Sequence, residues 1–421
     1  MNRVRLGIAA FCPVSVCAFG SCGTSLSGMG KIVLTGKGRR WIERGHPWVY
    51  KDDVADGKAE PGELIPVMSP NAEPMGWGLF SSNSRIAVRM VTRGPEQPNR
   101  AFWRARIERA VEARRRAGLM EPEGACRLLS GDAEGVPGLV IDRYADVYVL
   151  QCGTQSADRM RDFLVEILSE VLDAPPRAIV DRSDVGVRRL EGLEARVEMV
   201  RGEDLPEELT VREGSIEYRV DVFTGHKTGA YLDQRDNRML AASYARGGRV
   251  LDAFSYDGLF ALHAAAAGAE SVLCLEQNKA ACERIAENVA RNGLSSQVRV
   301  ERVDAMGRLR ELAEGDERFR LAVVDPPAFA RNKREVAGAE RGYVEVNRRA
   351  IGALESGGTL VSASCSYNIQ PEAFLKYLAS AGRLADRNVW LERLEGASVD
   401  HPYWIALPES HYLKCAFLRA D

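Results

Sequence analysis

The spacing of hydrophobic residues changes along the chain and predicts a different kind of element in each region. Between residues 30 and 95, short β-forming runs such as KIVLTG, ELIPVMS, MGWGLFS and IAVRMVT alternate with glycine turns. Regular short runs of this kind predict a small β-barrel-like domain. Within 96–119, apolar residues instead recur every three or four positions among arginines, which predicts an amphipathic linker helix.

The rest of the chain contains two further patterns. Residues 120–213 read as strand, turn, strand, helix and strand, from CRLLSGD to AIVDRS, and predict a compact middle α+β domain. From 214 to 421, β-forming runs such as RVLDAFS, SVLCLEQ, LAVVDPP and GTLVSASCS alternate with helical patterns. This alternation predicts an α/β domain with a mostly parallel sheet and helices on both faces.

The first 29 residues differ in composition from the remainder of the chain. Two early arginines precede a short apolar stretch, which Pro13 interrupts. A membrane span requires about 20 apolar residues, so this stretch is too short. We expect residues 1–29 to be a non-structural extension or a misassigned start before Met29, rather than a working signal peptide.

Charge and cysteine content narrow the function classes. The formal net charge of −2 provides no global basic field for nucleic acid, so RNA affinity would require local basic clusters. The chain has nine cysteines and no C-x-x-C pair, which argues against a disulfide framework and against a zinc site. These features predict a cytoplasmic protein without a metal centre or a membrane span.

Acidic residues close successive predicted strands of the C-terminal domain. Asp252 ends one strand before a turn that contains Gly258, Glu276 ends the next strand, and Asp304 follows a third. Open α/β sheets bind ligands at the carboxyl ends of their strands. The turn lacks the G-x-G-x-x-G pattern of a pyrophosphate cradle. The acids therefore favour an adenosine-type ligand without phosphates, S-adenosylmethionine, although each acid alone could simply cap a helix.

Two further strand ends carry residues suited to catalysis. Asp325 precedes two prolines that stiffen its loop, and Cys365 follows the strand GTLVSAS. C5 of a pyrimidine is too weakly nucleophilic to take a methyl group directly. A cysteine thiolate that adds to C6 makes the ring enamine-like, and an acid near N3 balances the charge. The pattern predicts Cys365 as nucleophile and Asp325 as its partner, while Cys274, Cys282 and Cys415 are expected to be packing residues.

From about residue 31 onward the chain resembles the bacterial large-subunit ribosomal RNA 5-methylcytosine methyltransferases, a class I S-adenosylmethionine-dependent family. The matching stretches include RRWIERGHPWVY, EGVPGLVIDRYAD, RSDVGVRRLEGL, TGHKTGAYLDQRDNR, LDAFSYDGLFALHAA, VVDPPAFARNK, SCSYNI and ESHYLKCAFLR. The resemblance implies an N-terminal PUA-type RNA-binding domain, a middle α+β domain and a Rossmann-like methyltransferase domain. It also implies that the cysteine of SCS is the nucleophile and that TGHKTGAYLDQRDNR closes over the cofactor, with Lys227, Gly229, Asp233, Gln234 and Arg235 near the site.

The expected cofactor-binding residues are taken from the strand ends and from this resemblance. They are Gln234, Arg235, Asp252, Phe254, Tyr256, Gly258, Glu276, Asp304 and Asp325.

The chain departs from the family pattern at two places. The cofactor turn commonly reads F-C-Y-T-G-G-F in relatives, whereas this chain has FSYDGLF, with Asp257 and Leu259. Relatives often carry a histidine after SCS, whereas Tyr367 and Asn368 occupy these positions in this chain. The base that removes the C5 proton is therefore not identified by the sequence.

Basic residues cluster near the start of the first domain and could bind RNA phosphates. Tryptophans in the same stretch offer surfaces on which bases can stack. The expected RNA-binding residues are Lys37, Arg39, Arg40, Arg44 and Trp48. Between 100 and 116 a second run of arginines is equally well explained as a solvated helix face.

The sequence as a whole predicts an enzyme that methylates C5 of a cytosine in ribosomal RNA of the large subunit, and a homodimer is one arrangement that it allows. Two alternatives stay open. One is methylation of another RNA base or atom, which Ala328 after the two prolines disfavours. The other is an RNA-binding ribosome-assembly protein with a vestigial cofactor site.

Overall fold

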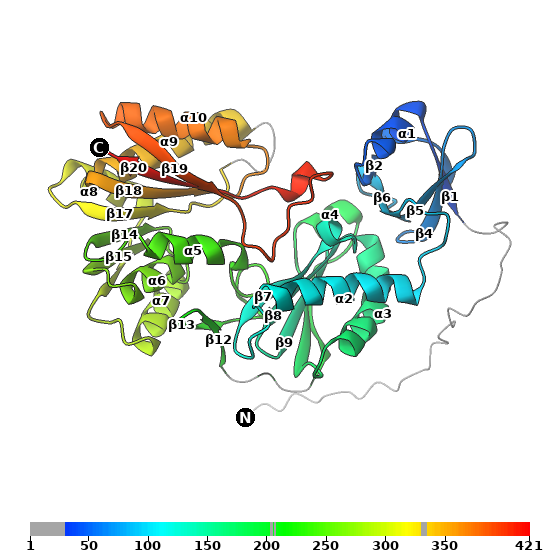
Figure 1. Cartoon of the computed structure of the whole chain (residues 1–421), viewed down its shortest axis with the longest axis horizontal. Helices are drawn as coiled ribbons and strands as arrows, with labels where there is room; N and C mark the ends of the chain where they lie inside the picture. Colours follow the sequence, from blue (N-terminus) through cyan, green and yellow to red (C-terminus); the bar gives the residue numbers. More distant parts are fainter. Residues whose placement is uncertain (1–29, 203–204, 206–207, 330–334) are drawn as a thin grey trace, which may run out of the picture.

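The computed structural model describes residues 30–202, 205, 208–329 and 335–421 (Figure 1). The predicted extension or misassigned start at 1–29 lies outside the described residues. The described chain forms three successive regions, each built on its own sheet. None of the helices in this described part combines the length and apolar character that crossing a bilayer requires.

The first region is a six-stranded sheet with strand order β2-β6-β5-β4-β1-β3. Its apolar residues form a core of their own, which includes Ile32, Ile65 and Val88. The helix α1 (Gly36–Glu43) is not predicted by the β-like spacing. It forms because the side chain of Thr35 caps it, accepting a hydrogen bond from the Gly38 amide at 3.0 Å. The strands are β1 (Lys31–Leu34), β2 (Trp48–Tyr50), β3 (Val54–Lys58), β4 (Leu64–Met68), β5 (Pro74–Phe80) and β6 (Ile86–Thr92).

The middle region is a five-stranded sheet with strand order β11-β10-β9-β8-β7. Two long helices, α2 (Arg100–Arg116) and α3 (Gln155–Val171), pack on it. The sequence predicts α2 as a linker, but Trp103, Ile107 and Val111 lie in the same core as the middle sheet. The helix is therefore an integral part of this region, as Figure 1 also shows. The strands are β7 (Ala125–Ser130), β8 (Leu139–Tyr144), β9 (Val147–Cys152), β10 (Ala178–Ser183) and β11 (Arg196–Arg201), and the short α4 (Val187–Glu191) follows β10.

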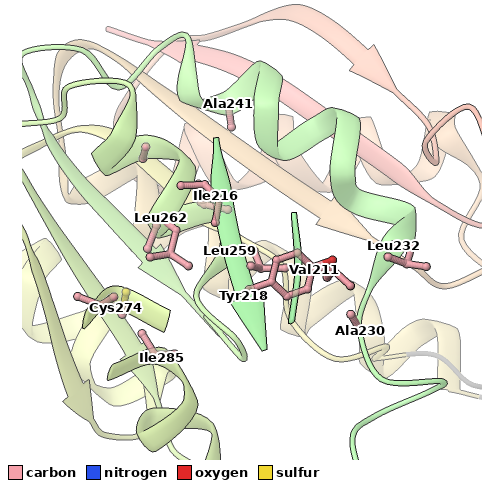
Figure 2. Packing of buried hydrophobic residues seen from close by; sticks show 14 of the residues in the cluster. Val211, Ile216, Tyr218, Ala230, Leu232, Ala241, Leu259, Leu262, Cys274 and Ile285 are labelled. Atoms are coloured by element: carbon pink, nitrogen blue, oxygen red, sulfur yellow. The ribbon is translucent and has the colours of Figure 1, made fainter. Parts of the chain in front are cut away.

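A hairpin of β12 (Leu209–Glu213) and β13 (Ile216–Val220) joins the middle and C-terminal regions. The predicted boundary between residues 213 and 214 falls in the turn of this hairpin. Val211, Ile216 and Tyr218 pack against residues of the C-terminal helices (Figure 2). The same cluster also contains Tyr144 from the middle sheet. The two regions thus share one continuous core.

The C-terminal region is a seven-stranded sheet with strand order β16-β15-β14-β17-β18-β20-β19. Neighbours from β16 to β18 are parallel, whereas β20 runs antiparallel between β18 and β19. The strands are β14 (Arg249–Ala253), β15 (Ser271–Glu276), β16 (Val298–Arg302), β17 (Phe319–Val324), β18 (Leu354–Ser364), β19 (Val389–Glu395) and β20 (Lys414–Ala420).

Helices cover both faces of this sheet (Figure 1). Alternate residues of a strand point to opposite faces, so Val323 packs in one core while Ala322 and Val324 pack in the other. The first core holds α5 (Arg235–Ala242), α6 (Leu259–Ala266) and α7 (Lys279–Arg291). The second holds α8 (Ala305–Glu314), α9 (Val336–Gly352) and α10 (Pro371–Leu384).

Candidate active site at the strand ends

Four adjacent parallel strands end at one edge of the C-terminal sheet. Ala253 at the end of β14 is paired with Leu275 of β15 on one side and with Val324 of β17 on the other. Val324 is in turn paired with Ser362, near the end of β18. Because the strands are parallel and in register, the residues that follow them meet at the same edge. We call this edge the strand-end site; it brings together Asp252, Glu276, Asp325 and Cys365.

The turn between β14 and α6 has a constrained backbone. Phe254 and Tyr256 have φ values of 66° and 51°, and Gly258 has 74°, all in the left-handed region. Such a conformation is costly for residues with a side chain and is concentrated at functional sites. The turn is fixed by hydrogen bonds from the Phe254 amide to the Leu275 carbonyl at 3.0 Å and from the Gly258 amide to the Ser255 carbonyl at 2.8 Å. It therefore presents a rigid surface toward the strand-end site.

Gly258 is required in this turn for a reason that the sequence does not reveal. The turn pattern suggests that its missing side chain lets the backbone approach a ligand. A Cβ at this position would lie 2.9 Å from Cγ2 of Ile285 on α7. The glycine thus serves the packing of α6 on α7 and the left-handed φ, and its predicted role in letting the backbone approach a ligand stays a prediction.

Asp252 is a buried acid with an unsatisfied acceptor. It is 2% exposed, and its Oδ2 has no hydrogen-bond partner within the described residues. Burial, together with the nearby carboxylates of Asp325 and Glu276, raises the pKa of Asp252 to about 7. A positively charged ligand group beside it would restore its charge.

Glu276 differs from Asp252 in that both of its carboxylate oxygens have hydrogen-bond donors. Its two carboxylate oxygens accept hydrogen bonds from the backbone amides of Tyr256 at 3.0 Å and Asn278 at 2.8 Å. These contacts hold the carboxylate between the β14 turn and the start of α7, while each oxygen keeps a further lone pair for a donor. The geometry suits an acceptor for ribose hydroxyls.

Asp304 is exposed and caps α8. Its Oδ2 accepts a hydrogen bond from the Gly307 amide at 2.8 Å. This is the helix-capping alternative that the sequence leaves open. The other carboxylate oxygen can still face a ligand, so a role for Asp304 in cofactor binding stays a prediction.

The segment 224–238 lies against the β14 turn. The His226 ring stacks on the Tyr256 ring at 4.7 Å, and the His226 amide donates to the Tyr256 hydroxyl at 3.0 Å. Lys227, at a left-handed φ of 54°, donates to Oδ2 of Asp233 at 2.8 Å. Within this segment, Leu232–Gln234 forms a short 3-10 turn, which is followed by α5.

The middle sheet holds this segment in place. The hydroxyl of Thr228 lies 2.8 Å from the Tyr144 hydroxyl and donates to Asp142 at 2.5 Å. The Ala230 amide donates to the same Tyr144 hydroxyl at 3.1 Å. Both middle-sheet residues belong to β8, so this strand supports the segment that faces the strand-end site.

Gln234 and Arg235 have different roles although they are adjacent. Nε2 of Gln234 donates to Oδ2 of Asp325 at 3.0 Å, which places it inside the site. Arg235 is 5% exposed and bonds both oxygens of Asp400 at 2.9 and 3.0 Å. Its Nε donates to the neighbouring Asp236. Through Asp400, Arg235 anchors the segment to the loop before β20. Direct cofactor binding by Arg235 stays a prediction.

Cys365 is half-buried immediately after β18. Burial and the carboxylates of Asp325 and Asp233 raise the pKa of its thiol, whereas Lys227 lowers it. Burial and Asp233 also raise the pKa of Asp325, to about 6. The acid predicted from the sequence therefore influences the ionisation of the predicted nucleophile at the strand-end site.

The three cysteines with predicted packing roles differ in how deeply they are buried. Cys274 and Cys415 are fully buried in the core, as expected. Cys282 is only half-buried, and its thiol lies 3.4 Å from the Glu276 carbonyl oxygen. It therefore borders the cofactor side of the site, a placement that its helical position alone could not indicate.

Asp257, which departs from the family pattern in the turn, has a partner on α7. Its Oδ1 accepts from Nε of Arg284 at 2.7 Å, and burial raises its pKa to about 6 despite that pair. The Arg284 guanidinium also lies 5.0 Å from the centre of the Tyr256 ring. The substitution therefore ties the turn to α7 through an ion pair.

The predicted RNA-binding residues fall into two groups. Lys37 pairs with Asp53 at 3.0 Å, and Arg39 pairs with Glu43 at 2.7 Å. Trp48 is half-buried and donates from Nε1 to Asp132 at 2.6 Å, which docks the first region on the middle region. The remaining two, Arg40 and Arg44, are exposed and form no ion pair within the described part of the chain.

The strand-end residues fit S-adenosylmethionine. The unsatisfied Asp252 oxygen is a buried acceptor suited to a cationic group, and the Glu276 carboxylate can accept from ribose hydroxyls. The turn 254–258 would run along the ligand, and Asp304 follows the next strand. Residues 330–334, which include the end of the DPPAFARNK stretch, lie outside the described part of the chain.

Comparison with known proteins supports the fold and the cofactor. Residues 32–93 match a model of a PUA-like domain, and residues 154–403 match a model of S-adenosylmethionine-dependent methyltransferases. A solved methyltransferase complexed with SAH shares the fold, with a TM-score of 0.81 and 19% identity over 92% of this chain and 99% of that one. A SAM-dependent methyltransferase from Streptococcus mutans gives a TM-score of 0.79 at 18% identity, with the same coverage of 92% and 99%.

Curated relatives match at higher identity. A protein from Shewanella denitrificans named ribosomal RNA large subunit methyltransferase I is 40% identical over 392 residues, covering 91% of this chain and 98% of the relative. A protein of the same name from Aliivibrio fischeri is 37% identical over 390 residues, covering 91% and 97%. The chain therefore belongs to the S-adenosylmethionine-dependent methyltransferases and, among them, to the family of ribosomal RNA large subunit methyltransferase I.

Proposed function

We propose that this enzyme methylates C5 of a cytosine in large-subunit ribosomal RNA through a covalent adduct with Cys365. The observation that carries the proposal is the position of a half-buried thiol on the same sheet edge as the cofactor turn, beside an acid whose pKa is raised to about 6. A thiol at this place has no purpose in direct methylation of an exocyclic nitrogen. The names of the relatives support ribosomal RNA as the substrate.

The chemistry divides into two steps on the RNA base. S-adenosylmethionine supplies an electrophilic methyl group on a sulfonium. The Cys365 thiolate adds to C6, forming a carbon–sulfur bond, and the protonated Asp325 gives its proton to N3. C5 then becomes nucleophilic toward the methyl group that S-adenosylmethionine would supply, whose bond to the sulfonium sulfur would break and leave S-adenosylhomocysteine.

The second step releases the product. A base removes the C5 proton, the bond between C6 and the Cys365 sulfur breaks, and the proton on N3 returns to Asp325. Gln234, which donates to Asp325 at 3.0 Å, keeps this carboxyl oriented. Lys227 and Asp233, whose charges act on both Cys365 and Asp325, are paired at 2.8 Å.

RNA binding is assigned mainly to the first region. Arg40 and Arg44 are the exposed arginines of α1 and its C-terminal end, so they are best placed to contact phosphates. Trp41, at 37% exposure, offers a stacking surface. Lys37 and Arg39 would first have to leave their carboxylate partners, and Trp48 would have to leave Asp132.

The covalent step is tested with RNA that contains 5-fluorocytosine. Fluorine cannot leave as a proton, so the adduct is trapped and withstands denaturant. We expect mass spectrometry to locate it on the peptide that contains Cys365. The Cys365→Ala variant should form no adduct and should lose methyl transfer by about 10⁴-fold or more, as expected when a nucleophile is removed.

Cys282→Ala is the matched control, because that thiol is also half-buried and borders the cofactor side. It should retain the adduct. Near-normal methylation by Cys365→Ala would exclude the covalent route, and a methyl group found on an exocyclic nitrogen would favour the other base chemistry. Failure to bind S-adenosylmethionine at all would favour an assembly protein.

A further inference from the structure

Lys414 is a buried lysine without an acidic partner. It is 1% exposed, although lysines are almost never fully buried unless they are paired. Its ammonium donates to the carbonyl oxygens of Ser366 at 2.6 Å and Tyr412 at 2.9 Å. No carboxylate in the described ranges forms an ion pair with it. Two neutral carbonyls do not balance a buried positive charge, so we expect a nearby anionic group to stabilise the Lys414 ammonium.

The fold places Lys414 next to the residues that flank the Cys365 thiol. Lys414 is the first residue of β20 and is paired in register with Ser364, the residue before Cys365. Its ammonium binds the carbonyl of Ser366, the residue after Cys365. Lys414 thus contacts the chain on both sides of the nucleophile. Burial lowers the pKa of Lys414 to about 8, and the charge of Cys365 counteracts this decrease.

Other titratable groups face Cys365 from the surrounding elements. Asp325 and Asp233 oppose ionisation of the thiol, and Lys227 favours it. The Lys227 charge, however, is already shared with Asp233 at 2.8 Å. Burial raises the pKa values of two nearby phenols, Tyr231 from the segment 224–238 and Tyr343 from α9, and the charge of Cys365 raises them further. Among these groups in the described structure, Lys414 is the cation that no carboxylate neutralises.

We propose that the Lys414 ammonium is the counter-ion of the Cys365 thiolate and sets the fraction of that thiol that is ionised at neutral pH. Lys414 is a positioning residue that acts through Cys365, since its ammonium is held by the two carbonyls. The thiol and the amine compete for one proton, and the pair thiolate plus ammonium is the reactive state. The inference rests on the proposed function of Cys365 as nucleophile.

The test measures ionisation of Cys365 directly in the full-length protein without RNA. The rate of alkylation by iodoacetamide is followed against pH, and mass spectrometry quantifies the peptide that contains Cys365. Lys414→Gln can still donate to the carbonyls but carries no charge, whereas Lys414→Arg keeps the charge. Lys376→Gln, an exposed position on α10, is the matched control.

We expect Lys414→Gln to move the midpoint of the alkylation profile up by about one pH unit, which slows alkylation about tenfold at pH 7. Lys414→Arg should keep the midpoint at or below that of the unmodified protein, and Lys376→Gln should leave it unchanged. S-adenosylmethionine affinity should be the same in all variants.

An unchanged profile in Lys414→Gln would show that the lysine only holds the loop, and would overturn the inference. If that variant does not fold, a midpoint in Lys414→Arg above that of the unmodified protein has the same consequence, because the charge is retained. Alkylation requires neither RNA nor methyl transfer. Absence of the fluorocytosine adduct would therefore refute the proposed function without altering this profile.

Discussion

The two halves of the strand-end site are built from different kinds of interaction. On the cofactor half, Glu276 accepts from two backbone amides at 3.0 and 2.8 Å, and Asp304 caps a helix. On the thiol half, Asp325, Cys365 and Lys414 lie together, and each has a shifted pKa. Backbone donors do not titrate near neutral pH, whereas Asp325 and Lys414, with pKa values of about 6 and about 8, do. On the cofactor half Asp252 is the group that also titrates there, with a pKa of about 7.

This difference matches the role that each half is proposed to have. Binding a cofactor requires acceptors at fixed positions, and backbone amides hold them there at little entropic cost. Adding and removing a thiolate requires protons that can move, and shifted pKa values are concentrated where such chemistry occurs. The middle region supports the segment 224–238 through Tyr144, and this segment contacts both the cofactor turn and Asp325. Substitutions in one half should therefore leave the function of the other half intact.

The largest effect is expected on the thiol half. Asp325→Asn removes the proton donor but keeps the size of the side chain and a contact with Gln234. Methyl transfer should fall by about 10²–10⁴-fold, the range for loss of a general acid. Fluorocytosine adduct formation should slow in parallel, because both depend on charge balance at N3. The measurements are single-turnover methylation and the rate of adduct formation.

The control for this variant is Asp316→Asn, an exposed residue before the other end of β17. It should leave both rates unchanged. S-adenosylmethionine affinity should change little in either variant, because the cofactor half is intact. A large loss of cofactor affinity in Asp325→Asn, with adduct formation unaffected, would place Asp325 on the cofactor half instead.

A smaller effect is expected on the cofactor half. Glu276→Ala removes the acceptor assigned to the ribose and the two backbone contacts that hold the turn. Loss of hydrogen bonds to a charged group costs about 1.5–3 kcal/mol, so S-adenosylmethionine should bind about 10–150-fold more weakly by calorimetry. Glu276→Gln keeps one acceptor oxygen and should lose less.

Glu270→Ala, just before the opposite end of β15, is the matched control and should bind the cofactor normally. Alkylation of Cys365 should be unaffected by Glu276→Ala, because the thiol half does not depend on this carboxylate. RNA affinity should also be preserved. Equal loss of cofactor and RNA affinity would mean that Glu276 maintains the fold rather than the ligand site.

The sequence predicts the residues at strand ends better than the residues brought there by tertiary contacts. Asp252, Glu276, Asp325 and Cys365 are predictable because parallel strands in register place their ends together, a rule that needs only hydrophobic runs. The PUA-like and methyltransferase folds are likewise predicted and are confirmed by the family matches.

Other features depend on contacts that no local pattern contains. Lys414 begins an apolar strand, and only its pairing with Ser364 reveals that it flanks the nucleophile. The ion pair between Arg235 and Asp400 has no local signal, because Asp400 is distant in sequence. The packing reason for Gly258 likewise comes from a residue on a different helix. In the sequence, the feature that singles out Lys414 is a charged residue inside the apolar run YLKCAFLR.

The smallest predicted effect concerns the pH dependence of cofactor binding. Burial raises the pKa of Asp252 to about 7, so in the free protein this carboxyl is about half protonated near neutral pH. A cationic group of the cofactor favours the carboxylate, so binding below pH 7 must release a proton. Affinity should therefore increase as the pH rises, by up to about tenfold between pH 6 and pH 8. Asp252→Asn should remove most of this dependence in calorimetry.

The stability of the free protein should change with pH in the opposite direction to cofactor affinity, so it should decrease as the pH rises. An acid whose pKa is higher in the folded than in the unfolded state stabilises the fold while it is protonated, and that contribution is lost as the pH rises from about 4 through about 7. Asp252→Asn stays neutral, so without cofactor its melting temperature at pH 8 should exceed that of the unmodified protein, and the two should converge toward pH 4. With saturating S-adenosylmethionine the order at pH 8 should reverse, because only the carboxylate attracts the cation. If the order stays the same with and without cofactor, Asp252 does not face the bound ligand, and the cofactor half would then rest on Glu276 and the turn alone.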